Sequence, residues 1–141
     1  MVPQIVVGPG HLDLLTVNIA TSTAIEQGDL ISYESALAVL LDANTEDATF
    51  LGYAFTSHFT DQAEPDKLVV ALAGIVTYDC TSASTYALAD KLAYDNATEN
   101  TLVESGSNTI AWVAKTPIGT VTRVDALINV LAVQKLFVAA A

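Results

Sequence analysis

Basic residues are scarce in this chain and absent from its first half. The 141 residues include five Lys or Arg and sixteen Asp or Glu, so the formal net charge is −11. Residues 1–66 contain ten acidic side chains and no Lys or Arg, and residues 67–141 contain the other six acidic side chains and all five basic ones. Phosphate backbones repel so acidic a chain, and we expect no nucleic-acid partner. The acidic half either favours solubility or meets a basic partner surface.

The residues that usually carry chemistry are also few. Cys80 is the only cysteine, which excludes an intrachain disulfide, and no basic neighbour in sequence activates its thiol. His11 and His58 stand alone, outside any metal-binding or triad spacing, and we interpret both as structural or surface residues. We therefore predict no catalytic residue, no metal site and no cofactor, and we do not expect an enzyme. No apolar run reaches the roughly 18 residues of a membrane span, so no membrane partner is expected.

One acidic segment has the composition of a metal-binding loop. Asp42–Asp47 places oxygen-bearing side chains at alternating positions, which resembles the start of a calcium loop. The central glycine of such a loop is missing, and Tyr53 stands where its bidentate glutamate belongs. We favour a solvated loop, and calcium binding by this segment remains the open alternative.

A repeated segment is the main positive signal. Gly28–Ser35 is echoed by Ala89–Asn96, 61 positions later (28 to 89), and Phe50–Ala54 is echoed by Ile110–Ala114, 60 positions later (50 to 110). With 52% hydrophobic and 15% charged residues, the chain is expected to build a substantial core. The sequence therefore predicts an internal pseudo-repeat with units at about 23–78 and 85–137.

The pattern of β-branched residues and turn signals predicts an all-β fold with little helix, either a small β-barrel or a sandwich. We expect one barrel domain over residues 21–141, preceded by an extended N-terminal arm over residues 1–20. Two prolines and two glycines, Pro3, Gly8, Pro9 and Gly10, exclude a regular helix there. The arm is either the first strand of the domain or a segment that pairs with a sheet edge on a neighbour.

Aromatic residues fall in both copies of the repeat. We expect them to pack in the core at equivalent positions, with Tyr33 matching Tyr94 and Tyr53 matching Val113. The alternative is an exposed stacking platform for sugars that would include Trp112.

Short motifs in this order resemble a known family. The segments Gln27–Ile31, Phe50–Ala54, Val69–Ile75 and Ala89–Tyr94 look like those of the tailed-bacteriophage head decoration (capsid cement or stabilisation) protein family. The resemblance covers about residues 23–137. The second copy departs from it by carrying Ala89 where the first carries Gly28.

The resemblance implies a virion structural protein. Such a protein decorates and stabilises an icosahedral phage capsid by bridging major capsid subunits, as a homotrimer on the outer surface of the virion, after synthesis in the host cytoplasm. The alternative is a virion surface domain that binds carbohydrate or a receptor. For a decoration protein, the resemblance implies that the N-terminal arm binds the capsid through its apolar residues, which are Ile5, Val6, Val7, Leu12, Leu14 and Leu15.

Overall fold

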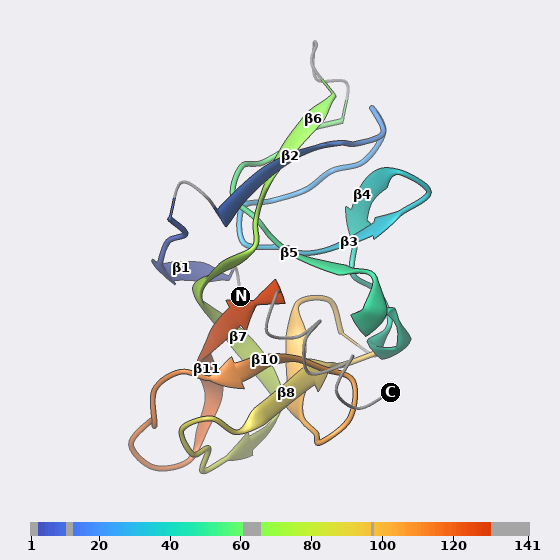
Figure 1. The fold of residues 1–141 in the computed structure, drawn as a ribbon. Coiled ribbons are helices and arrows are strands. Elements are labelled where there is room, and N and C mark those ends of the chain that lie inside the picture. The colour runs from blue at the N-terminus through green and yellow to red at the C-terminus, as the bar shows by residue number, and fades with distance from the viewer. Residues whose placement is uncertain (1–2, 11–12, 61–65, 97, 131–141) are drawn as a thin grey trace.

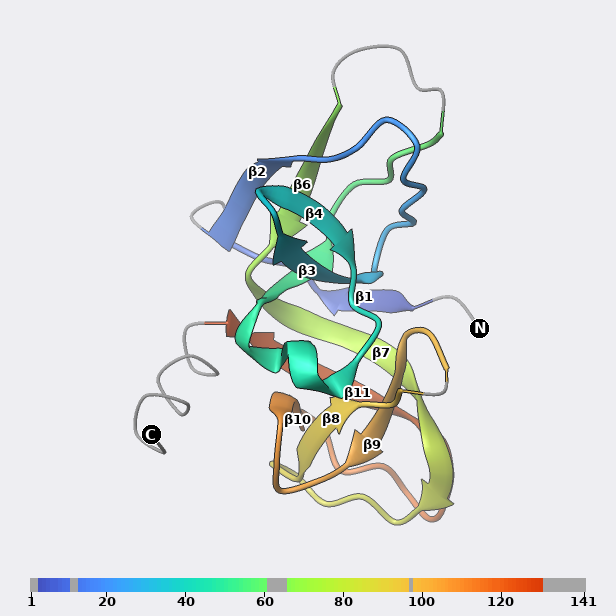
Figure 2. The same ribbon diagram turned by 90° about the vertical axis from the view of Figure 1, so that its right-hand side faces the viewer.

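A computed structural model describes residues 3–10, 13–60, 66–96 and 98–130 (Figures 1 and 2). The described chain is mainly β and confirms the predicted all-β class. One sheet has the strand order β1-β7-β11-β10-β8-β9, and a further pairing of β7 with β9 closes its last five strands into a barrel. Its strands are β1 (Gln4–Val7), β7 (Ala73–Ser84), β8 (Lys91–Tyr94), β9 (Thr101–Glu104), β10 (Thr109–Val113) and β11 (Val121–Asn129).

The other sheet holds the remaining strands in the order β2-β6-β5-β3-β4. Its strands are β2 (Leu14–Asn18), β3 (Leu30–Glu34), β4 (Leu37–Leu40), β5 (Phe50–Ala54) and β6 (Lys67–Ala71). A parallel bridge between Ile19 and Ala38 brings the end of β2 to β4, so this sheet also curls towards closure. A short 3-10 helix, η2 (Asn44–Ala48), occupies the segment expected to be a polar loop.

The strand registers show that the five-stranded barrel β7–β11 and the five-stranded sheet β2–β6 are copies of one unit. Asn18 pairs with Lys67 in the first unit, and Asp79 pairs with Arg123 in the second. The parallel contact of Ile19 with Ala38 matches that of Cys80 with Leu102. The registers therefore define a first unit of β2–β6 and a second unit of β7–β11, rather than the boundaries 23–78 and 85–137.

The repeated turn, which precedes β3 in the first unit and β8 in the second, has the same hydrogen bonds in both units. In the first, Asp29 accepts a bond from the Glu26 N–H at 2.9 Å, and its own N–H donates to the Glu26 carbonyl at 3.1 Å. In the second, Asp90 accepts from the Ala87 N–H at 2.8 Å and donates to the Ala87 carbonyl at 3.1 Å. The aspartate thus fixes the turn by bonding its own local backbone.

The turn is kept in the second unit although its glycine is missing. Gly28 has φ +94°, and Ala89 takes the same left-handed region with φ +70°. Most residues other than glycine avoid this region because the Cβ crowds the backbone. The fixed aspartate contacts outweigh that strain, so the Gly-to-Ala departure does not remove the turn.

Two segments differ from what their composition predicts. The apolar run over residues 67–78 predicts one long strand, but it forms two, because β6 ends at Ala71 and β7 begins at Ala73 in the other sheet. The Ser/Thr-rich residues 79–86 predict a connection, but as far as Ser84 they are the second half of β7. The alternation of buried Val76, Tyr78 and Cys80 with less buried neighbours is the half-buried strand pattern.

The units stack along the long axis of the molecule, with the first unit above the second in Figure 1. The larger of two core clusters contains side chains from both units, including Leu30, Phe50 and Tyr53 from the first unit and Tyr94 and Ile128 from the second. The smaller cluster lies within the first unit. The boundary between the units is therefore part of the main hydrophobic core.

Candidate interaction surface

The N-terminal residues form two edge strands at the boundary between the units. β1 is the terminal strand of the six-stranded sheet and pairs with β7, and β2 is the terminal strand of the other sheet and pairs with β6. Residues 4–7 and 14–18 are thus strands of the chain's own sheets, the first of the two alternatives weighed for residues 1–20. An edge strand leaves one row of backbone groups available for pairing with another chain.

The predicted arm residues divide by exposure. Val6 and Val7 on β1 are each 52% exposed and Leu15 on β2 is 42% exposed. Ile5 and Leu14 are partly buried and pack against the larger core cluster. Leu12 lies outside the described residues. The structure therefore keeps Val6, Val7 and Leu15 available to a partner, whereas Ile5 and Leu14 hold the strands in place.

Two glycines hold β1 close to the body. A Cβ on Gly28 would lie 2.9 Å from the Cβ of Pro3, so the segment before β1 passes directly over the first repeated turn. A Cβ on Gly74, which has φ +151°, would lie 2.7 Å from the Val7 carbonyl oxygen and 2.1 Å from the Tyr53 hydroxyl. Only glycine fits this close approach of β1, β5 and β7.

Polar contacts join the units behind these strands. Asn100 donates through Nδ2 to Asp29 Oδ1 at 2.8 Å and accepts from the Leu30 N–H through Oδ1 at 2.9 Å. The Tyr78 hydroxyl donates to the Gly28 carbonyl at 2.7 Å. Burial, opposed by hydrogen bonds, raises the pKa of Asp29 above its ordinary value. Hydrogen bonds from the second unit therefore hold the first repeated turn in place, next to the edge strands.

Tyr53 marks the centre of this boundary. Its side chain is fully buried, and its hydroxyl donates to the Ala73 carbonyl at 3.0 Å. Burial, with a smaller effect of the Asp13 charge, raises the pKa of Tyr53 to about 12. The phenol therefore stays neutral at ordinary pH and acts as a hydrogen-bond donor to the β7 backbone.

The residues weighed for chemistry have structural surroundings. His58 is 0% exposed, with Nδ1 2.6 Å from the Thr23 carbonyl and Nε2 3.3 Å from Asp66. Cys80 is buried, and burial raises the pKa of its thiol, which disfavours the reactive thiolate. His11 lies outside the described residues. Within the described ranges, no group of three or more His, Cys, Asp or Glu side chains is placed to hold a metal ion.

The acidic segment weighed for calcium brings two carboxyl groups together. Burial, and then the neighbouring Asp42, raises the pKa of Glu46 to about 7. The Asp42 N–H also donates to Glu46 Oε2 at 3.3 Å. The pair shares a site in which protonation of Glu46 relieves the repulsion between the two carboxylates.

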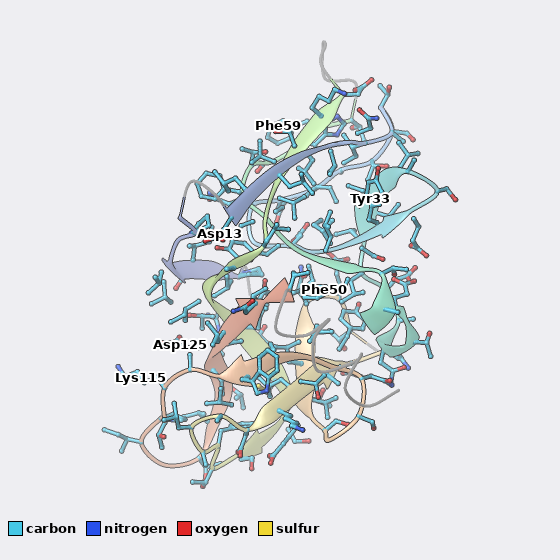
Figure 3. All side chains as sticks on the ribbon, viewed as in Figure 1. Asp13, Tyr33, Phe50, Phe59, Lys115 and Asp125 are labelled. Carbon is cyan, nitrogen blue, oxygen red and sulfur yellow. The ribbon has the colours of Figure 1, made fainter. Side chains whose placement is uncertain are left out.

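The aromatic residues are mostly core residues, with two clear exceptions. Tyr53 and Tyr94 are buried, whereas Tyr33 is 39% and Phe59 is 65% exposed. Figure 3 shows Phe50 at the boundary between the units and Tyr33 farther from it. The registers match Tyr33 with Tyr94, as expected, but they match Tyr53 with Trp112 rather than Val113. Tyr53 pairs with Leu30 at the start of β3, and Trp112 pairs with Lys91 at the start of β8. The burial of Tyr94 and the exposure of Tyr33 show that equivalent positions in the two units have different surroundings.

Comparison with known proteins adds no family to these observations. No family model matches the chain, and no curated protein matches it. None of the helices in the described residues has the length and hydrophobicity that a membrane span requires.

Proposed function

We propose that this protein decorates the outer surface of an icosahedral phage capsid and stabilises it by bridging major capsid subunits, as a homotrimer. The observation that carries the proposal is the pair of apolar edge strands fixed at the boundary of a rigid two-unit β body. The resemblance of the repeated segments to phage head decoration proteins supplies the class of partner.

Strand addition is the contact that this surface suits. A segment of a capsid subunit that pairs along β1 would gain backbone hydrogen bonds from the open edge. It would also cover Val6 and Val7, each of which is 52% exposed. Full burial of a valine side chain is worth about 1.5 kcal/mol or more, and many decorating copies would act together on one shell.

Single substitutions test the contact better than removal of the N-terminus. Deletion of residues 1–12 would take away β1 and the core contact of Ile5, so it would mix binding with folding. Val6→Asp and Val7→Asp instead add a charge at exposed positions. Ile118→Asp is the matched control, because Ile118 is 100% exposed and lies in the connection between β10 and β11.

The measurement is co-sedimentation with heads of the phage that encodes the protein, after the native copies have been removed. We expect each β1 variant to bind at least about tenfold more weakly, because a buried carboxylate would replace a buried apolar group. The control should bind normally, and all three should keep the wild-type melting temperature. Wild-type binding by both β1 variants would show that this edge is not the shell contact, and no binding by the wild type would refute the function itself.

A further inference from the structure

We propose that copies of this chain associate head to tail, so that the outer wall of the second unit in one copy covers the open end of the first unit in another. Inside the chain, the outer wall of the first unit covers one end of the second-unit barrel. Because the units are copies, the second unit has an equivalent wall and the first unit has an equivalent end. Both of these equivalent surfaces are partly exposed.

The first surface is one end of the second-unit barrel. Val76, Tyr94 and Ile110 are 0%, 4% and 1% exposed. They belong to the same core cluster as side chains of the first unit, which are Leu30, Leu41, Phe50, Tyr53 and Ala71. This end of the second barrel is therefore closed by the first unit.

The equivalent end of the first unit is open. The strand registers match Val76, Tyr94 and Ile110 with three first-unit residues, which are Leu15, Tyr33 and Leu51. Leu15 is 42% exposed, Tyr33 is 39% exposed and Leu51 is partly exposed. These side chains share a hollow of about 400 Å³, the first-unit hollow, whose other lining residues are Thr16, Val17, Asn18 and Lys67.

The second surface is a row across the outer wall of the first unit. Leu30 pairs with Tyr53, and Tyr53 pairs with Ala71, so the three side chains share one face of the sheet. They are 1%, 0% and 0% exposed, because this wall packs against the second unit.

The equivalent row on the second unit has exposed or partly exposed side chains and is not packed against the first unit within the described residues. Lys91 pairs with Trp112, and Trp112 pairs with Leu127, in the same register. Lys91 is exposed, Trp112 is partly exposed and Leu127 is 38% exposed. We call this row the second-unit wall. Tryptophan is among the residue types that anchor protein interfaces when a partner covers them, and Leu127 adds apolar area beside it.

Charge favours a second copy as the occupant of the first-unit hollow. Inside the chain, the wall residue Leu30 contacts the connection between β8 and β9, because the Leu30 N–H donates to the Asn100 side chain there. The strand registers match this β8–β9 connection with the Ser35–Ala36 turn between β3 and β4, which directly follows Glu34. Between copies, Lys91 takes the place of Leu30 and comes to this turn, where Glu34 attracts it.

The contact is heterologous, because the two surfaces differ and lie on different units. Such contacts either close into a ring or extend into a chain of copies. The inference rests on the homotrimer of the proposed function and deepens it by naming the surfaces that would join the copies. The association needs no capsid, so sedimentation tests it separately from the binding to heads that co-sedimentation measures.

Sedimentation velocity of the purified protein over a wide concentration range tests the contact. We expect the wild type to move from the 14.8 kDa monomer to larger species as concentration rises. Leu127→Asp should weaken association by about tenfold or more, because it places a carboxylate in the apolar contact. Ile118→Asp is the matched control, since it adds the same charge at a fully exposed apolar position outside both surfaces. A wild type that stays monomeric to about 1 mM, or equal association by Leu127→Asp and wild type, would overturn the inference.

Charge exchange identifies the partner surfaces. Glu34→Lys and Lys91→Glu should each weaken association by about threefold, and the double variant should recover most of the loss, because the pair is restored with opposite orientation. Both residues are exposed, so the variants should keep the wild-type melting temperature. Additive losses in the double variant would show that the two residues do not meet across the contact.

Discussion

The Tyr78 hydroxyl gives the sharpest test of the contact between the units. Tyr78 lies on β7 with 0% exposure, and its hydroxyl donates to the Gly28 carbonyl of the first repeated turn at 2.7 Å. Complete burial raises the pKa of Tyr78 well above its ordinary value, so the hydroxyl is a permanent donor at working pH. Tyr78→Phe keeps the ring and removes only this bond between the units.

The expected loss follows from the burial of both partners. A hydrogen bond of this kind contributes about 0.5–1.5 kcal/mol net, and a carbonyl left unpaired in a buried site costs about 1–3 kcal/mol. We expect Tyr78→Phe to lower the free energy of unfolding by about 2 kcal/mol. For a chain of this size, that corresponds to a fall in melting temperature of roughly 4–8 °C.

Tyr86→Phe is the matched control. The Tyr86 hydroxyl donates to the Ser82 carbonyl at 2.8 Å and also has a side-chain hydrogen bond with Cys80, so its loss removes bonds within the second unit without touching the boundary. We expect this variant to lose less stability, about 1 kcal/mol.

Urea denaturation followed by two probes is the assay. Trp112, the single tryptophan, reports on the second unit by fluorescence, and far-ultraviolet circular dichroism reports on both units. Because the main core spans the boundary, the two transitions should coincide in the wild type. Tyr78→Phe with wild-type stability would refute the argument, and separate transitions in the wild type would refute the shared core as the basis of cooperativity.

Three further predictions concern the repeated turn, the acidic pair and the buried histidine. In thermal unfolding, Ala89→Gly should stabilise the protein by about 0.5–1 kcal/mol, because it releases the strain of a left-handed alanine. Gly28→Ala should destabilise it by more than about 1 kcal/mol, because the added Cβ would crowd Pro3. The reverse order would refute the equivalence of the two turns. The pKa of Glu46, raised to about 7, gives a stabilising contribution that is complete below the ordinary value of 4.5 and lost as pH rises through about 7. Because solvent screens this partly exposed group, the loss should stay below about 1 kcal/mol, and Glu46→Gln should abolish it. An unchanged pH profile in that variant would assign the effect elsewhere. His58→Phe should cost about 2–4 kcal/mol in urea titrations through its lost buried bonds, and a neutral result would show that the Thr23 and Asp66 contacts do not stabilise the fold.

The repeat was predictable where the two copies keep the same residue types. Asp29 and Asp90 stand at the same place and close the same turn, so the 61-residue offset could be found in the sequence. The match between β2 and β7, the first strands of the two units, could not be found in the sequence. Leu15 and Val76 share only hydrophobicity, and β7 follows β6 with one intervening residue. The boundaries of the units therefore needed the strand registers.

The candidate surface was predictable only as a list of apolar residues. Val6 and Val7 are exposed and Ile5 is packed against the core, although all three are β-branched neighbours in one short run. Their division depends on a β-bulge between Ile5 and Val7, which changes the pairing with β7. The first-unit hollow was missed for a similar reason: Tyr33 was expected in the core because Tyr94 resembles it, but only Tyr94 has a neighbouring unit to cover it.

A single residue, Leu72, separates the last strand of the first unit from the first strand of the second. Its N–H donates to the Asp13 carbonyl at 2.7 Å, and its carbonyl accepts from the Val130 N–H at 3.0 Å. The junction is therefore too short and too well bonded to extend, and tension on one unit is transmitted directly to the backbone hydrogen bonds between β7 and β11. That ladder would be loaded in shear along its length, so many hydrogen bonds would share the force at once, which would suit the capsid-bridging role proposed above.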